Sequence, residues 1–584
     1  MEKIAASLLA TAGIACAQTY NYDSSSETLV ITGKGNTVAD RITLEGPITP
    51  GSTVPGTSEI FGDTKEIILK DVWTSPDSIR IKYVEPTSDG NNTTLKLENS
   101  RLGASGDFDK GGTGLILILD SQSSLELYGN RLTNTIRIEN QGNIKCTNGT
   151  VSASSYLWDN KTATGSSGVL GGSGYYSFGN VSSIETNKDF GLIKTSGQIT
   201  DLEISGIYTV DGNSAKTIGD DSYIVGVNTS SSSDGQAMTI SGSLTINAKQ
   251  GTGIGILANQ LGSDDVSLKN NYSGQIYVTA KDAFGVKVGK NAAMDPSAAG
   301  DIYSLSVGEL DIESTITSGS TQGEATGIYA KSVKRDLTAN AITVKGYTNA
   351  TGIHLTEGGR NLTISDMQVS AGISGNAAGI IAAPGRDNPV STAGNLENIR
   401  IDNLEVSGGA DATGIFANSI TKSGQSENII ANITVSSENG LATGIFADNA
   451  DINLGGRILS SSARFNAYGI WTENELYLKM FDGSEISAIA ANEHSIAQAI
   501  RSKNLYLTFE GRATINGDIM ADVGMMLDNG YNVVVNGNIE GSHLFTESTI
   551  GTVSGKMKFD SVAGLNITAS VGSLEIGTSG QDSG

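Results

Sequence analysis

Cysteine is almost absent from this chain of 584 residues, which contains only Cys16 and Cys146. We expect Cys16 to be removed with an export signal, so the mature protein can form no internal disulfide. Small secreted domains usually depend on such cross-links, and their absence indicates a different source of stability. Proline is scarce too, with eight residues, and no later stretch of 18 or more consecutive apolar residues occurs, so we expect no membrane-spanning helix.

Positive charge is also in short supply. The 38 basic residues stand against 62 acidic ones, which gives a net charge of −24. This excess opposes binding to nucleic acid, and no basic stripe interleaved with aromatic residues occurs, so we exclude nucleic acid as a partner. The three histidines, His354, His494 and His543, are scattered, which argues against a histidine-based metal site. We therefore predict no metal and no cofactor.

Glycine is abundant, with 74 residues, and much of it belongs to a recurring phrase of the type Ala-Thr-Gly-Ile-Phe-Ala. Clear copies begin at Ala325, Ala350, Ala412, Ala442 and Ala467. Looser copies surround Gly226, Gly255, Gly285, Gly379, Gly524 and Gly564, and Ala499 takes the place of the glycine in one more. Self-similarity at such an interval, roughly 25 to 40 residues, predicts a stack of units, each of which buries its apolar face against its neighbours.

The phrase can be converted into geometry because successive side chains of a strand point to opposite faces. The residue after the glycine is always apolar, and we expect it to face the core. These residues are Val227, Ile256, Val286, Ile328, Ile353, Ile380, Ile415, Ile445, Ile470, Ile500, Met525 and Leu565. The glycine itself and the residue two positions after it, for example Lys287 or Tyr329, are then expected on the outward face. There the glycine permits a close approach of another segment.

Further short strands precede each phrase. Ile342-Thr-Val344 and Leu404-Glu-Val406 alternate apolar and polar residues and begin shortly before their glycines. Leu95-Lys-Leu-Glu98 and Leu125-Glu-Leu-Tyr128 are separated by a similar interval and suggest the same period near the N-terminus. Three short strands in each repeat of roughly 25 to 30 residues predict an all-β fold, a right-handed parallel β-helix with occasional inserted loops. Residues 486–500 also show some helical spacing, but we favour strand, turn and strand there.

The chain divides into four segments by composition. Residues 1–17 have the pattern of a signal peptide, with Lys3, an apolar run from Ile4 to Ala15 and cleavage after Ala17. Residues 18–190 form a less regular β-helical region, and residues 191–576 contain the regular repeats. Residues 577–584 are a polar C-terminal tail.

The signal, the acidic Gly/Asn/Ser/Thr-rich body and the Ala-Thr-Gly-Ile-Phe-Ala phrases resemble bacterial autotransporter passenger domains and related pectin-lyase-like β-helical surface proteins. The resemblance implies export to the cell surface or beyond it and a role in adhesion. That family ends in an outer-membrane barrel, whereas this sequence ends in a polar tail after Leu574-Glu-Ile576. Association with an outer membrane is therefore expected only through a segment outside this sequence or a separate partner.

A polysaccharide lyase or glycoside hydrolase on the same scaffold is the main alternative. Such enzymes need clustered carboxylates, often with a basic neighbour. The adjacent pairs Asp220-Asp221 and Asp264-Asp265 have no evident basic partner, and Arg80-Ile-Lys82 lacks the other elements of a polygalacturonase signature. We predict no catalytic residues and a non-catalytic surface protein. A self-assembling surface-layer component is a third possibility.

The outward positions of the phrase form the remaining candidate site. Aromatic side chains recur there and are predicted to form a column: Tyr329, His354, Phe416, Phe446 and Trp471. Such a column can stack against sugars of a host or environmental glycan, or dock a surface protein. Alternatively, the rings stabilise one another or lie beneath an inserted loop, and this structural interpretation is the one we favour.

Overall fold

The computed structural model shows an all-β chain. It describes residues 19–23, 28–32, 66–70, 93–105, 115–128, 132–133, 135–147, 150–151, 155–160, 166–171, 175–179, 183–184, 189–195, 199–212, 223–230, 236–290, 296–315, 323–384, 393–424, 426–529, 532–546, 549–563, 566–567 and 571–576. The predicted signal peptide (1–17), the polar tail (577–584) and Leu565 lie outside the described residues. The chain contains two compact units, residues 1–281 with 290–293, and residues 282–289 with 294–584.

Strands make up nearly all of the described structure, with one short 3-10 helix, η1 (Pro296–Ala298). The first strands are β1 (Thr19–Asp23), β2 (Thr28–Thr32), β3 (Glu66–Lys70), β4 (Thr93–Glu98), β5 (Arg101–Ser105), β6 (Leu115–Leu119), β7 (Ser124–Tyr128), β8 (Leu132–Thr133), β9 (Thr135–Asn140), β10 (Asn143–Thr147), β11 (Thr150–Val151), β12 (Ser155–Asn160), β13 (Ser166–Gly171), β14 (Tyr175–Gly179), β15 (Ser183–Ile184), β16 (Asp189–Thr195), β17 (Ile199–Ile204), β18 (Ile207–Asp211), β19 (Tyr223–Thr229), β20 (Met238–Ile240), β21 (Ser243–Ala258) and β22 (Asn270–Val288).

The later strands are longer on average. They are β23 (Asp301–Ser314), β24 (Glu324–Gly346), β25 (Asn349–Arg360), β26 (Leu362–Ala371), β27 (Asn376–Ala382), β28 (Asn395–Glu397), β29 (Arg400–Gly408), β30 (Ala412–Thr421), β31 (Ile429–Ser437), β32 (Ala442–Ser462), β33 (Ala467–Phe481), β34 (Ser484–Ala490), β35 (Ala497–Glu510), β36 (Ala513–Asn516), β37 (Asp518–Asp528), β38 (Val533–Asn536), β39 (Ile539–Thr546), β40 (Thr549–Ile550), β41 (Thr552–Ala563), β42 (Asn566–Ile567) and β43 (Val571–Ile576). No helix among the described residues has the length and apolar character needed to cross a membrane.

Parallel pairing between successive repeats organises the first unit. One ladder joins β5, β7, β10, β14, β18 and β21, and another joins β4, β6, β9, β13 and β17. The predicted strands at Leu95 and Leu125 exist, but they belong to different ladders: Leu95 pairs with Leu117, and Leu125 pairs with Leu102 and Ile144. The spacing between Leu95 and Leu125 was therefore the wrong period, because the true partners of both strands lie closer in the sequence.

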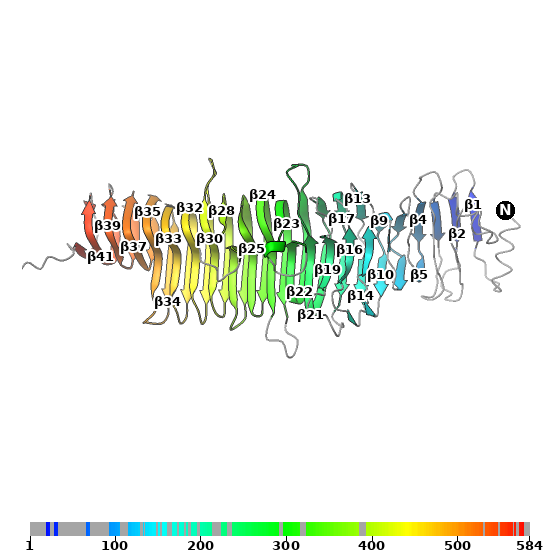
Figure 1. Ribbon diagram of the computed structural model, residues 1–584, viewed down its shortest axis with the longest axis horizontal. Coiled ribbons are helices and arrows are strands. Elements are labelled where there is room, and N and C mark those ends of the chain that lie inside the picture. The colour runs from blue at the N-terminus through cyan, green and yellow to red at the C-terminus, as the bar shows by residue number, and fades with distance from the viewer. Residues whose placement is uncertain are drawn as a thin grey trace, which may run out of the picture. The chain divides into compact units, whose positions relative to one another are not determined.

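The second unit repeats one register over successive phrases (Figure 1, green to orange). The residue after each glycine pairs with its equivalent in the next repeat, in the order Val286, Ile328, Ile353, Ile380, Ile415, Ile445, Ile470 and Ile500. The upstream strands pair in the same way, so that Ile342 lies beside Met367, which lies beside Leu404. Each repeat therefore places equivalent residues against each other on more than one side.

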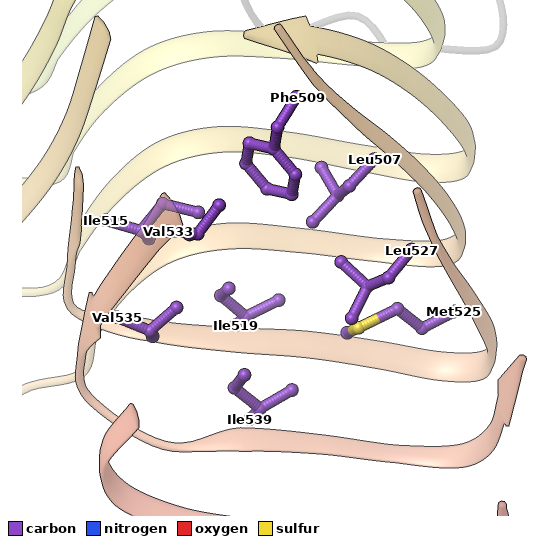
Figure 2. A pocket seen from close by; sticks show the side chains of 9 residues that line it. All are labelled: Leu507, Phe509, Ile515, Ile519, Met525, Leu527, Val533, Val535 and Ile539. Carbon is purple, nitrogen blue, oxygen red and sulfur yellow. The ribbon is translucent and has the colours of Figure 1, made fainter. Parts of the chain in front are cut away.

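The predicted core positions are confirmed wherever they are described. All eleven from Val227 to Met525 are at most 1 % exposed. Figure 2 shows a later part of this interior, where Phe509, Ile519 and Met525 are among the side chains directed into the space between the strands. The cavity left there is about 10 Å³, which is about the space of one water molecule. The interior is thus a packed apolar core.

The alignment of the phrase at Gly524 was wrong. Ile500 pairs with Ile519, while Met525 pairs with Leu505 and Leu544 further along the same strands. Ile519 continues to Ile539 and then Met557, so the repeats after Ile500 are shorter than those before it. By contrast, the expected strand, turn and strand at residues 486–500 is confirmed, because β34 ends at Ala490 and β35 begins at Ala497.

The glycine of the phrase is required by a close approach, but not on the face that we expected. A Cβ on Gly327 would lie 2.5 Å from the carbonyl oxygen of Gly352 and 2.9 Å from Cγ2 of Ile342, a buried side chain. The missing side chain would therefore point inward, not outward. Thr326 and Ile328 pair with residues of the next repeat, but Gly327 between them does not. The alternation of inward and outward side chains therefore fails at this glycine.

We predict that Gly414→Ala destabilises the protein by about 1–3 kcal/mol or more, because its Cβ would collide with the carbonyl oxygen of Gly444, a backbone atom of the next repeat. Gly455→Ala is the matched control, since a Cβ there meets nothing within 4 Å. The measurement is the urea concentration at the midpoint of unfolding for each variant. Amide hydrogen exchange of residues 442–447 reports on the contact itself. Equal midpoints for the two variants would contradict the close-approach explanation.

Candidate functional site

The outward positions of the phrase lie in one column, as the sequence predicts. Tyr329 pairs with His354, and beyond Ile381 the register continues through Phe416, Phe446 and Trp471. Ring contacts join the column: Tyr329 and His354 meet edge to face at 5.2 Å, Phe416 and Phe446 lie 5.5 Å apart, and Phe446 and Trp471 lie 4.8 Å apart between ring centroids. Stacked repeats thus bring together side chains that are distant in the sequence.

Much of this column is covered, as in the favoured interpretation in which the rings lie beneath an inserted loop. Tyr329, His354 and Phe416 are 1 %, 6 % and 8 % exposed, respectively. Nε2 of His354 lies 2.9 Å from the carbonyl oxygen of Ala383, and Phe416 packs in a cluster that includes Ala383 and Ala393. Alternation identifies the side of a strand, but not what covers that side, and here residues of the longer repeat between Gly379 and Gly414 cover it.

The other end of the column is partly open. Phe446 and Trp471 are of intermediate exposure. Trp471 also contacts the ring of Tyr468 at 4.8 Å, and the guanidinium carbon of Arg501 lies 5.1 Å from the Trp471 ring. These contacts stabilise the end of the column through ring packing and a cation–π interaction. The favoured sequence interpretation, mutual stabilisation of the rings, describes this geometry well.

Lys287 occupies the same column beside Tyr329 and is the unusual residue there. It is completely buried, and its ammonium lies 4.6 Å from the ring centroid of Phe284 and 4.2 Å from that of Tyr329. Its Nζ atom hydrogen-bonds to no described residue. Burial lowers the pKa of Lys287 to about 7, because removal from water disfavours the charged form. From its place in the repeated phrase, we expected Lys287 on the outward face. Neighbouring side chains pack over it there and bury it.

We predict that Lys287→Met stabilises the protein, most strongly below pH 7. In the folded chain Lys287 loses its proton near pH 7, whereas the unfolded chain holds it up to about 10.5. Between these values the unfolded state binds more protons, so the wild-type free energy of unfolding rises with pH by at most about 1.4 kcal/mol per unit. The advantage of the variant should fall over this window.

The measurement is the difference in unfolding free energy between variant and wild type from pH 6 to pH 10. Lys345→Met is the control, since Lys345 is exposed and its substitution removes no buried charge. A flat difference for Lys287→Met would show that the faces of Phe284 and Tyr329 keep the ammonium charged when it is buried.

A second buried polar group lies in the first unit, and the sequence interpretation missed it. The hydroxyl of Tyr156 donates to Asp189, the side-chain amide of Asn228 donates to that hydroxyl at 2.8 Å, and the ammonium of Lys194 lies 3.6 Å from Asp189. Burial is the main reason that the pKa of Tyr156 lies well above its usual value, and the charge of Asp189 adds to it. The register of β12, β16 and β19 assembles this network from three repeats.

This network contains one carboxylate, and its polar atoms are engaged with one another. Satisfied networks of this kind make a buried site specific and rigid. We therefore interpret the network as structural.

Of the two aspartate pairs considered as candidate catalytic residues, the structure describes one. Asp264 and Asp265 lie on an exposed turn, where Asp265 accepts a hydrogen bond from the backbone of Ser267 at 2.9 Å. Asp220 and Asp221, and the segment from Arg80 to Lys82, lie outside the described residues. Within the described ranges, no group of three or more His, Cys, Asp or Glu residues is arranged to hold a metal ion.

A partly exposed column further along the chain was not predicted from the sequence. Tyr477, Tyr506, Met526 and Phe545 pair in register across β33, β35, β37 and β39. Tyr477 and Tyr506 stack at 4.4 Å with an angle of 4° between their planes. The alternation of Leu476-Tyr-Leu478 and Leu505-Tyr-Leu507 carries the signal, because the leucines are core residues and the tyrosine between them must point outward.

Comparison of the chain with protein-family models, with curated proteins and with solved structures finds no match. The geometry of the chain's own residues therefore carries the functional argument.

Proposed function

We propose that this chain is an exported, non-catalytic interaction protein built as a right-handed parallel β-helix, comparable to an autotransporter passenger domain. One observation carries the proposal: equivalent residues of successive repeats pair in parallel and in register, from Val286 to Ile500. A winding chain whose coils stack at about 4.8 Å produces this register. Such stacking supplies stability to a mature chain that can form no internal disulfide.

An adhesive or surface role is supported by the composition and by the exposed side chains. Residues 1–17 have the pattern of a cleaved export signal, and the net charge of −24 keeps a long array soluble. Apolar side chains on consecutive repeats are partly exposed, with Tyr477 at 44 %, Met526 at 47 % and Phe545 at 56 %. Exposed apolar groups gathered in this way mark interaction surfaces. The partner class is a glycan or a surface protein.

Expression of the whole chain in a Gram-negative bacterium tests the proposal. We expect mass spectrometry to find Gln18 at the N-terminus of the mature protein, and protease added outside intact cells, or analysis of the medium, to find the chain outside the cytoplasm. The double variant Ala15→Arg with Ala17→Arg is the control, because it should block cleavage. A chain that keeps Met1 and stays in the cytoplasm would contradict export.

Binding of the purified mature chain, coated on beads, to mammalian cells or glycan-coated surfaces tests the adhesive role. We expect retention above that of beads coated with an unrelated acidic protein. Polymerisation of the isolated chain end to end, without such retention, would favour a surface-layer component instead. Turnover of polysaccharide by the purified chain would overturn the non-catalytic assignment.

A further inference from the structure

We propose that a pocket between β35, β37 and β39 binds one neutral sugar ring of a glycan. Its lining includes Asn504, Tyr506, Val523, Met526, His543 and Phe545, and its volume is about 210 Å³. The interior cavity of about 10 Å³ has the space of one water molecule, so a pocket of about 210 Å³ has room for a single six-membered ring with its substituents. The inference rests on the proposed surface function and names its ligand class.

A break in the repeat creates the pocket. Ser502 and Asn504 pair with Ala521 and Gly524, and these pair in turn with Gly541 and His543. The middle strand, β37, therefore contains one residue more than either neighbour over this stretch. A β-bulge of this kind bends a strand and redirects a side chain, and such bulges are common beside binding sites. Here Val523 lies at the bulge with 42 % exposure and forms part of the pocket wall.

Gly524 opens the floor of the pocket. A Cβ there would have Oδ1 of Asn504, at 3.9 Å, as its nearest neighbour, and the backbone is outside the left-handed region. This contrasts with the glycines of the phrase, where a Cβ would meet backbone atoms. The space above Gly524 is therefore not needed for packing of the repeats.

The pocket combines an aromatic wall with neutral polar groups. Tyr506 is held in place by stacking on Tyr477, and Phe545 is largely exposed on the opposite side of Met526 in the register. Nδ1 of His543 lies 2.7 Å from Oγ of Ser561, which orients the imidazole and leaves Nε2 for another partner. The side-chain amide of Asn504 hydrogen-bonds to no described residue, so it can both donate and accept.

Charge selects a neutral ligand. Of the described residues that line the pocket, none is Asp, Glu, Lys or Arg, and the chain as a whole has a net charge of −24. Sulfated or carboxylated glycans would therefore be repelled. A sugar ring presents apolar C–H groups to an aromatic side chain and hydroxyl groups to an amide and an imidazole. This combination of an apolar wall and a few polar groups is the usual composition of a small-molecule site.

The test uses the mature chain and the methyl glycosides of glucose, galactose, mannose and N-acetylglucosamine at millimolar concentration, with saturation-transfer NMR and tyrosine fluorescence as readouts. We expect at least one of the four to bind, and Gly524→Leu, which fills the pocket, to weaken binding at least tenfold. Tyr506→Ala should weaken it too. Tyr347→Ala is the matched control, since Tyr347 is an exposed tyrosine outside the pocket, and it should bind like the wild type.

Thermal melting and circular dichroism of Gly524→Leu should match those of the wild type, because its side chain enters open space. Absence of binding by all four glycosides, unchanged binding by Gly524→Leu, or preferential binding of heparin fragments would each overturn the proposal. Failure of this pocket is distinguishable from failure of the surface function. If Gly524→Leu is exported, and beads coated with it bind cells as well as beads coated with the wild type, then only the sugar pocket is rejected and the surface function stands.

Discussion

The close stacking of one glycine per repeat against the backbone of the next is the constraint on which the second unit depends. At Gly327 and Gly414 any side chain would collide with a carbonyl oxygen of the adjacent repeat. The neighbouring aliphatic residue, Ile328 or Ile415, then fills the core in register with its equivalents. Many weak contacts of this kind add up along the array, and no disulfide is needed.

The same register organises the outer side chains, because the residue after each core residue also stacks on its equivalents in the neighbouring repeats. Whether these side chains are buried or exposed depends on which other residues lie over them. Tyr329 lies in a closed environment beside the buried Lys287, whereas Tyr477, which stacks on the half-buried Tyr506, is exposed. A ladder of aromatic residues is therefore either part of the packing or part of the surface, and the coverage by longer repeats decides which.

The proposed sugar pocket lies where the repeat is broken. The bulge at Val523 separates neighbouring side chains and leaves a hollow beside Tyr506 and Phe545. A site in such an array is thus expected where one strand departs from the register of its neighbours, and local departures from ideal structure are commonly associated with function.

The sequence by itself determined the all-β class, the buried positions from Val227 to Ile500 and the alignment of Tyr329 through Trp471, because these follow from strand alternation and a repeated phrase. It could not determine the partner of Ile500, since repeats of different length have several plausible alignments and only pairing selects Ile519. Nor could it determine that Tyr329, His354 and Phe416 are covered, or that Asp189 joins Tyr156 and Asn228. Tertiary structure decided these points, because burial and hydrogen bonding depend on residues distant in sequence that only the packed chain brings together.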